Sequence, residues 1–325
     1  MALATRLRPR GQPRTRLPKG PAPWAHRFGR ALALGGLWVG GCGGGEDAAA
    51  PSASASTRET PLKVAPVVTR RAEADPNPLK LPARRLELEP GDRVFTVPEP
   101  MLRGAQMGSS FAFRAATVTG RDGEDFLIDG RDGPVYRVHP AYVIPLAGVS
   151  RPKLESPVLA EWGGAMRHGV VRKYVKDKIV VRFLDTADSS DRPLAPEQLA
   201  LQKDGFHPGN YAVVKTAGAK VPAGTAAGVA YNHVMLVSPV GEGEWLAVGM
   251  LGATSRVAEK DMLVVPLTFT PKEGATVWAE HLGLMREARV TEVDRPGLVT
   301  VRFARVGRPV TVGWGQLMPP AKLGS

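Results

Sequence analysis

The sequence predicts an all-β protein made of four small barrels that follow a disordered N-terminal region. Three observations lead to this fold class. The chain repeats itself internally, its segments are short and rich in β-branched residues between turns, and no stretch has convincing helical periodicity. Units of about 50 to 65 residues with about five such strands would expose sheet edges unless they closed, so each unit is expected to be a barrel.

The internal repeat is clearest between residues 152–171 and 271–290. The segments PKLESPVLAEWGGAMRHGVV and PKEGATVWAEHLGLMREARV align without a gap and share nine residues, each 119 positions apart. Fainter matches at a similar offset extend over the remaining parts of the chain. The sequence therefore predicts a duplicated pair, A-B-A′-B′, with units at 89–148, 152–203, 206–268 and 271–320.

The expected strands are bounded by turn residues. Val299, Val301 and Phe303 alternate with more polar neighbours, which is typical of a half-buried antiparallel strand. The pairs Asp122-Gly123 and Asp132-Gly133 flank the segment DFLID and predict two hairpin turns around one strand. The same acidic stretch lacks the ligand spacing of a calcium loop, so no metal site is expected there.

The order of segments within a unit resembles Tudor-like and SH3-like barrels. An opening V-x-A strand is followed by a loop with bulky residues, an A-x-V strand, a tight turn, V-x-V-x-F, and a segment ending in Q-L-x-P. The resemblance is clearest over 157–201 and 274–319. It implies small closed barrels, and in Tudor-like domains an aromatic cage often binds a methylated amine through cation–π attraction.

Four aromatic residues are the candidate ligand-binding residues: Trp162, Trp278, Trp314 and Tyr136. Trp162 and Trp278 fall in the first loop region of the two B units, but four positions apart in the alignment, so a repeated cage is not supported. For Trp314 and Tyr136 a structural role inside a barrel is favoured over ligand binding. Glu161 and Glu280 recur in the repeat and are expected to accept hydrogen bonds from Arg167 and Arg286, which recur with them.

The N-terminus has the pattern of an export signal. Residues 1–30 carry eight basic and no acidic residues, and the uncharged run ALALGGLWVGG that follows is too short to span a bilayer as a helix. The residues Val39-Gly40-Gly41-Cys42 resemble the bacterial lipobox. This resemblance implies that residues 1–41 are a lipoprotein signal peptide and that Cys42, the only cysteine, is acylated. The alternative is that Cys42 is a stray or buried thiol that follows an ordinary cleavable signal or a misassigned start.

Removal of the signal would change the charge of the chain. The formal net charge is +12, but residues 42–325 hold 35 of the 43 basic residues against 31 acidic ones, or about +4. A nucleic-acid partner is therefore disfavoured. This hypothesis regains its support if the basic residues of 1–41 stay on the mature chain. With no second cysteine after Cys42, disulfides and thiolate metal sites are excluded, and packed cores must stabilise the fold.

Residues 42–88 are predicted to be a disordered or extended tether. The segment GGGEDAAAPSASAS and the proline- and charge-rich stretch after it contain too little apolar surface to offset the entropy lost on ordering. Such a tether would hold the folded part away from the membrane.

No catalytic or cofactor motif stands out in the sequence. The five histidines after Cys42 are scattered, and neither a zinc-protease, a nucleophile-elbow nor a phosphate-binding motif is present. We therefore expect no enzyme activity, no cofactor and no metal. A Ser/His/Asp site assembled from distant positions, as in an envelope hydrolase, stays an alternative.

The sequence as a whole predicts a lipid-anchored binding or scaffolding protein of the bacterial cell envelope. Its expected partners are the bilayer, through acylated Cys42, and an unidentified envelope protein or peptidoglycan, the latter by analogy with wall-binding SH3-type domains. Gly43 after the anchor favours the outer over the inner membrane. The rival hypothesis is a cytoplasmic nucleic-acid-binding protein with a functional basic arm.

Overall fold

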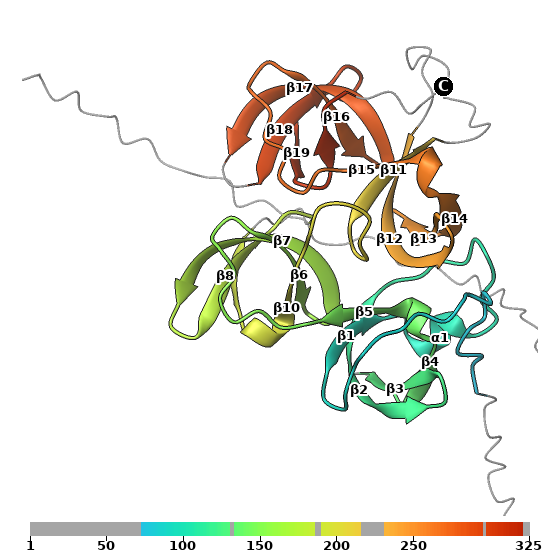
Figure 1. Cartoon of the computed structure of the whole chain (residues 1–325). Coiled ribbons are helices and arrows are strands. Elements are labelled where there is room, and N and C mark those ends of the chain that lie inside the picture. The colour runs from blue at the N-terminus through green and yellow to red at the C-terminus, as the bar shows by residue number, and fades with distance from the viewer. Residues whose placement is uncertain (1–72, 131–132, 186–189, 216–230, 295–296, 321–325) are drawn as a thin grey trace, which may run out of the picture. The chain divides into compact units, whose positions relative to one another are not determined.

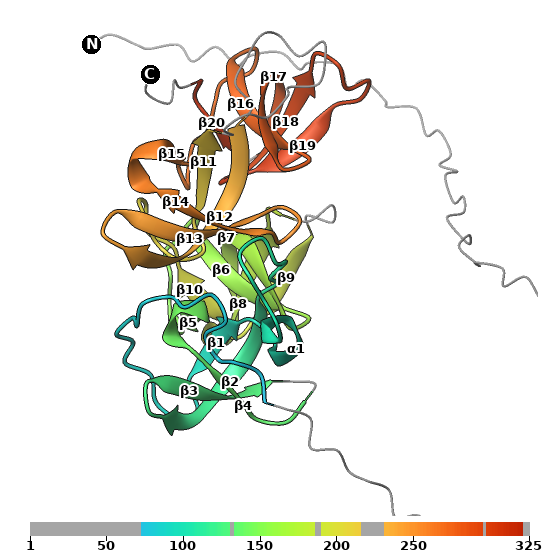
Figure 2. The same ribbon diagram turned by 90° about the vertical axis from the view of Figure 1, so that its right-hand side faces the viewer.

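The computed structural model describes residues 73–130, 133–185, 190–215, 231–294 and 297–320. These residues form two antiparallel sheets of ten strands each, with short helical segments, so the predicted all-β class is confirmed. Cys42 and the predicted signal lie outside the described residues. Figures 1 and 2 label the strands in chain order.

The first sheet contains two sets of five strands. The first set is β1 (Arg93–Thr96), β2 (Arg114–Asp122), β3 (Asp125–Gly130), β4 (Tyr136–Val138) and β5 (Val143–Leu146). The second set is β6 (Pro157–Trp162), β7 (Ala165–Val175), β8 (Lys178–Phe183), β9 (Asp191–Leu194) and β10 (Leu199–Leu201). A one-turn helix, α1 (Glu99–Leu102), and the 3-10 turns η1 (Pro140–Tyr142) and η2 (Pro196–Gln198) lie between strands.

The second sheet also contains two sets. The third set is β11 (Tyr211–Lys215), β12 (Tyr231–Gly241), β13 (Glu244–Gly249), β14 (Thr254–Ala258) and β15 (Met262–Val264), with the 3-10 turn η3 (Glu259–Asp261) before β15. The fourth set is β16 (Thr276–His281), β17 (Leu284–Asp294), β18 (Leu298–Phe303), β19 (Val310–Gly313) and β20 (Leu317–Met318). Each of the four sets lies within one of the four predicted ranges.

The four sets share one order of strand pairing. In each set the first strand pairs with the second and the fifth, the second with the third, and the third with the fourth, always antiparallel. Each second strand also has an irregular register against the third, at Val118, Val171, Leu236 and Val290. Such a bulge bends the strand and strengthens its twist, which lets five short strands curl.

One short pairing joins the two sets within each sheet. In the first sheet Arg114 of β2 pairs with Ala165 of β7, and in the second sheet Asn232 of β12 pairs with Leu284 of β17. The sheets are therefore continuous across neighbouring sets.

The predicted strand chemistry appears in the cores. Val299, Val301 and Phe303 are buried, whereas Arg302 between them is exposed, so the predicted alternation is confirmed. The turn predicted at Asp122-Gly123 joins β2 to β3, and the turn predicted at Asp132 falls partly outside the described residues. Buried apolar side chains form a separate cluster inside each of the second, third and fourth sets. A larger cluster is centred on the first set.

The prediction of a disordered or extended tether as far as residue 88 is wrong for residues 73–88. Leu79 and Leu81 are buried against the first set. Asn77 fixes this segment, because its side-chain amide bonds both the N–H and the carbonyl of Leu81, at 2.9 and 2.8 Å. The N–H of Leu79 also donates to the hydroxyl of Tyr142, at 3.2 Å. Two leucines and one asparagine are enough to hold a segment whose overall composition predicts disorder.

Candidate functional site

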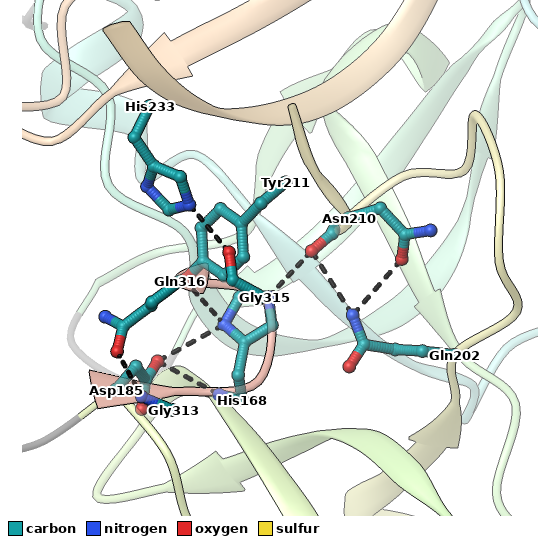
Figure 3. Close-up of polar contacts among 10 residues, drawn as sticks. His168, Asp185, Gln202, Asn210, Tyr211, His233, Gly313, Gly315 and Gln316 are labelled. Carbon is teal, nitrogen blue, oxygen red and sulfur yellow. Dashed lines mark hydrogen bonds and ion pairs between the residues drawn. The ribbon is translucent and has the colours of Figure 1, made fainter. Parts of the chain in front are cut away.

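Three aromatic rings from different strands stack on one another. The ring of Tyr211 in β11 lies between His168 of β7 and His233 of β12 (Figure 3). The ring centroids are 4.3 and 4.4 Å apart, and both pairs are inclined by 33°. His168 and His233 are both buried. The stack therefore joins the second set to the third.

The two histidines occupy the same place in their sets. Each lies three residues before the bulge of its second strand, and each contacts a glycine carbonyl through Nε2. The distances are 2.7 Å from His168 to Gly209 O and 2.8 Å from His233 to Gly315 O. Because a carbonyl only accepts hydrogen bonds, Nε2 carries a proton in both rings. One histidine thus contacts the loop entering the third set, and the other contacts the loop before β20.

Only His168 also has a carboxylate neighbour. Oδ2 of Asp185 accepts a hydrogen bond from the His168 backbone N–H at 3.0 Å and lies 3.2 Å from Nδ1 of the ring. The Tyr211 hydroxyl lies 2.9 Å from the same Nδ1. In the tautomer that carries its proton on Nε2, Nδ1 accepts a hydrogen bond from the Tyr211 hydroxyl. The other oxygen of Asp185, Oδ1, is buried with no hydrogen-bond partner among the described residues.

This geometry is not that of a catalytic triad. In a Ser/His/Asp site the carboxylate and the nucleophile contact opposite nitrogens of the imidazole, so that the ring can pass a proton between them. Here Asp185 and the Tyr211 hydroxyl both face Nδ1, and Nε2 is occupied by the Gly209 carbonyl. The cluster is arranged to hold three elements together.

Burial keeps both Tyr211 and His233 uncharged at neutral pH. Burial raises the pKa of Tyr211 well above 10, and the charges of Asp185 and Glu280 raise it further. Burial lowers the pKa of His233 to about 4, although its bond to the Gly315 carbonyl acts in the opposite direction. A general acid or base works best with a pKa near the operating pH, so neither group is suited to proton transfer at pH 7.

A cavity of about 700 Å³, here called the shared cavity, is lined by residues of all four sets. Its charged lining residues are Arg114, Arg167, Asp185 and Glu280, and Tyr211 and His233 line it as well. Apolar side chains complete the lining, among them Phe111, Phe113, Met166 and Met235. Met250 and Leu251, which are 58% and 84% exposed, also belong to it. Volumes of about 300 to 1,000 Å³ are typical of small-molecule sites.

The two arginines of the shared cavity have no carboxylate partner among the residues that the structure describes. Neither Arg114 nor Arg167 forms an ion pair with a described residue, and Nε of Arg167 is buried without a hydrogen-bond partner there. Glu280 uses Oε1 to accept the backbone N–H of Gly283 at 2.7 Å. The cavity therefore holds two cations and two anions that are not neutralised by one another.

A second cavity of about 720 Å³ lies beside the first set and includes Tyr136. The hydroxyl of Tyr136 donates to the carbonyl of Val97 at 3.1 Å, and burial raises its pKa. Glu99 also lines this cavity but forms an ion pair with Arg103. Tyr136 thus combines a structural hydrogen bond with a place beside a cavity.

The structure does not bring the three candidate tryptophans together. Trp162 is 42% exposed and lies near Phe183 and Arg192, Trp278 is half-buried against Tyr231, and Trp314 is buried among Val170, Leu184 and Leu298. None of the three lines either cavity described above. Trp314 therefore packs between the second and fourth sets, as a core residue would.

The predicted pairing of Glu161 with Arg167 is wrong. Glu161 instead forms an ion pair with Arg93 of β1, which belongs to a different set. Glu280 accepts a hydrogen bond from the backbone N–H of Gly283, and within the described residues it forms no hydrogen bond or ion pair with Arg286. In antiparallel strands, residues that are six apart along a hairpin need not face one another, because register decides which side chains meet.

Neither the histidine stack nor the two arginines of the shared cavity were predicted from the sequence. The repeat offset of 119 residues relates A to A′ and B to B′, but His168 and His233 are 65 residues apart and relate B to A′. A comparison of second strands between all four units would have found them. The position of Tyr211 between them depends on how the sets pack.

The described residues contain neither a cluster of metal ligands nor a membrane-spanning helix. No group of three or more His, Cys, Asp or Glu residues is placed to hold a metal ion there. In that part of the chain no helix is long and apolar enough to cross a membrane.

Comparisons with known proteins add little. No protein family matches this sequence, and no curated protein does. Among solved structures the chain is similar to AGDP1 AGD34 of Arabidopsis thaliana, with 15% identity and a TM-score of 0.23 over 35% of this chain and 82% of that one. At this score the similarity supports neither a fold nor a function.

Proposed function

We propose that this chain is a non-catalytic binding or scaffolding protein of the bacterial cell envelope. It is exported, held on the outer membrane through acylated Cys42, and built of four SH3-like barrels in two related pairs. The partner is an envelope component, either a protein or peptidoglycan.

The strand pairing supports the proposal of four barrels. In every set the strands lie in the order fourth, third, second, first, fifth, so the first and last strands along the chain are neighbours. A barrel forms when such a set curls far enough to bring its fourth strand to its fifth, which would cover the two remaining edges. The bulges at equivalent places in the four second strands supply the bend that closure requires.

The joints between sets support the proposal of a duplicated pair. The N–H of Ala115 in β2 donates to the carbonyl of Gly164, and the N–H of His233 in β12 donates to the carbonyl of Gly283, both at 2.9 Å. Gly164 and Gly283 are 119 residues apart and belong to the sequence repeat. The same hydrogen bond therefore joins the first set to the second and the third set to the fourth.

The observation that carries the binding role is the shared cavity. All four sets contribute to its lining, and its two arginines have no anionic partner among the described residues. Arg114 is exposed to solvent, whereas Nε of Arg167 and Oδ1 of Asp185 are buried without a hydrogen-bond partner in that part of the chain. Buried polar atoms of this kind cost stability unless a ligand or water satisfies them. The histidine stack beneath it lacks triad geometry, which favours binding over turnover.

The anchoring step is tested on cells that express the native chain. The mature N-terminus is analysed by mass spectrometry in membrane fractions, for the native chain and for Cys42→Ala. The expected result is an acylated Cys42 as the first residue, with the variant uncleaved or released from the membrane. Two or more acyl chains on one terminus hold a protein stably at a bilayer, so the loss should be nearly complete.

An intact, unmodified Met1 terminus in the soluble fraction would overturn the envelope assignment. The retained basic arm would then restore the +12 charge, and salt-dependent binding to nucleic acid would become the next measurement.

A further inference from the structure

We propose that the shared cavity binds a short zwitterionic peptide, with free amino and carboxyl ends and an apolar body. The inference rests on the proposed function as a binding protein and names the ligand class of the same site. Three properties of the lining carry it: two arginines that form no ion pair with a described residue, one buried carboxylate oxygen without a partner there, and an apolar wall that reaches solvent.

The cationic end of the site is formed by Arg114 and Arg167. These residues come from neighbouring strands of different sets, because Arg114 pairs with Ala165, two residues before Arg167. Residues two apart on a strand lie on the same face of the sheet. Two guanidinium groups on one face suit a carboxylate, which they can bind through paired N–H donors.

The anionic end is formed by Asp185 and Glu280. Oδ1 of Asp185 is buried without a partner among the described residues, while Oδ2 is committed to His168. Glu280 has one oxygen bonded to the Gly283 N–H and lines the same cavity. An ammonium group would satisfy these acceptors with charge-assisted hydrogen bonds.

The opposite charges of the cavity are held apart. No ion pair within 4.0 Å joins either arginine to Asp185 or Glu280. A simple anion would satisfy the arginines and leave the buried oxygen of Asp185 unpaired, which is costly. A ligand that carries both charges satisfies both ends at once.

The apolar lining fits the body of such a ligand. Phe111 and Phe113 are buried in the wall, and Met250 and Leu251 are exposed. Methionine is common at binding surfaces because its flexible thioether adapts to different apolar groups. The volume of about 700 Å³ accommodates more than a single amino acid.

The test is isothermal titration calorimetry on the full chain with three probes that differ only at their ends. Free Leu-Leu dipeptide carries both charges, N-acetyl-Leu-Leu lacks the ammonium group, and Leu-Leu amide lacks the carboxylate. We expect saturable binding of the free dipeptide and at least tenfold weaker binding of each capped form, because each loses charge-assisted hydrogen bonds.

Two variants test which residue binds the carboxylate of the dipeptide and which binds its ammonium group. Arg167→Gln should weaken binding of the free dipeptide about tenfold but leave Leu-Leu amide unchanged, since that probe has no carboxylate to lose. Glu280→Gln should weaken the free dipeptide and leave N-acetyl-Leu-Leu unchanged, while still accepting the Gly283 N–H. Arg302→Gln, at an exposed position outside the cavity, is the matched control and should bind like the native chain. Circular dichroism of each variant establishes that it folds.

Equal binding of all three probes, or no saturable binding of the free dipeptide, would overturn this ligand class. The proposed function is judged separately. An acylated Cys42 together with saturable cosedimentation on purified peptidoglycan, or on an envelope protein, would leave the binding role intact. Conversely, dipeptide binding by a chain that keeps Met1 would preserve the site and remove the envelope assignment.

Discussion

His168 and His233 occupy the same place in two successive sets of strands, yet their surroundings differ by one carboxylate. Both rings contact Tyr211, and both donate through Nε2 to a glycine carbonyl. His168 also lies beside Asp185, whereas burial without such a partner lowers the pKa of His233 to about 4. The comparison shows that the same contact between a histidine and a glycine carbonyl occurs at both joints, and that only His168 has a carboxylate beside its Nδ1.

The largest expected effect comes from replacing the two glycines, Gly315 and Gly209, whose carbonyls accept hydrogen bonds from the histidines. Gly315 and Gly209 both have φ in the left-handed region, at +81° and +85°. A Cβ on Gly315 would lie 2.8 Å from the Tyr211 ring, which is fixed between two imidazoles, whereas a Cβ on Gly209 would meet the flexible end of Leu159. Gly315→Ala should therefore lower the free energy of unfolding by about 3 kcal/mol and Gly209→Ala by about 1 to 2 kcal/mol, measured by urea unfolding.

Gly91→Ala is the control for this pair, because Gly91 also has a left-handed φ, at +99°, and a Cβ there meets nothing within 4 Å. A loss as large in Gly91→Ala as in Gly315→Ala would show that backbone strain, and not contact with Tyr211, is the cause.

The next effect concerns acid stability and depends on His233. Its pKa in the folded chain is about 4, below the ordinary value of 6.5. Between pH 6.5 and 4, His233 is therefore protonated in the unfolded chain and neutral in the folded chain. The contribution of His233 to stability is present above pH 6.5 and is lost as the pH falls toward 4, by up to about 3 kcal/mol.

His233→Gln removes this titration and should flatten the dependence of the unfolding free energy on pH between 6.5 and 4. The measurement is urea unfolding at intervals of pH, with native chain and variant compared at each value. An unchanged slope in the variant would place the acid sensitivity elsewhere.

The smallest effect concerns the hydroxyl that Tyr211 directs at one histidine only. Tyr211→Phe keeps the stacked ring and removes the contact with Nδ1 of His168, so we expect a loss of about 1 kcal/mol in the free energy of unfolding. Tyr231→Phe is the matched control, since Tyr231 stacks on Trp278 and its hydroxyl makes no hydrogen bond with a described residue. Equal losses in both variants would mean that the hydroxyl of Tyr211 adds nothing specific.

Local features of the fold could be predicted from the sequence. The alternation around Val301 marks a strand with one buried face, and Asp122-Gly123 marks a hairpin turn, because both depend on residues close in the chain. The burial of Leu79 was missed because its partner Tyr142 is 63 residues away. The composition of a segment does not indicate which distant surface will cover it.

The candidate site was less predictable than the fold. Aromatic residues drew attention because of a resemblance, yet the shared cavity is lined by Arg114, Arg167 and Asp185, which no motif connects. The pairing of Glu161 with Arg93, 68 residues apart, shows the same difficulty. Side chains from different sets meet only through packing, which leaves no spacing signal in the sequence.

The shared cavity ties ligand occupancy to the integrity of the whole folded region. Because its lining comes from all four sets, an occupant would contact every one of them, and separation of any single set would open the site. A molecule that binds only the closed arrangement stabilises it by mass action. Limited proteolysis of the native chain would therefore slow as the site fills, including cleavage at places far from the ligand.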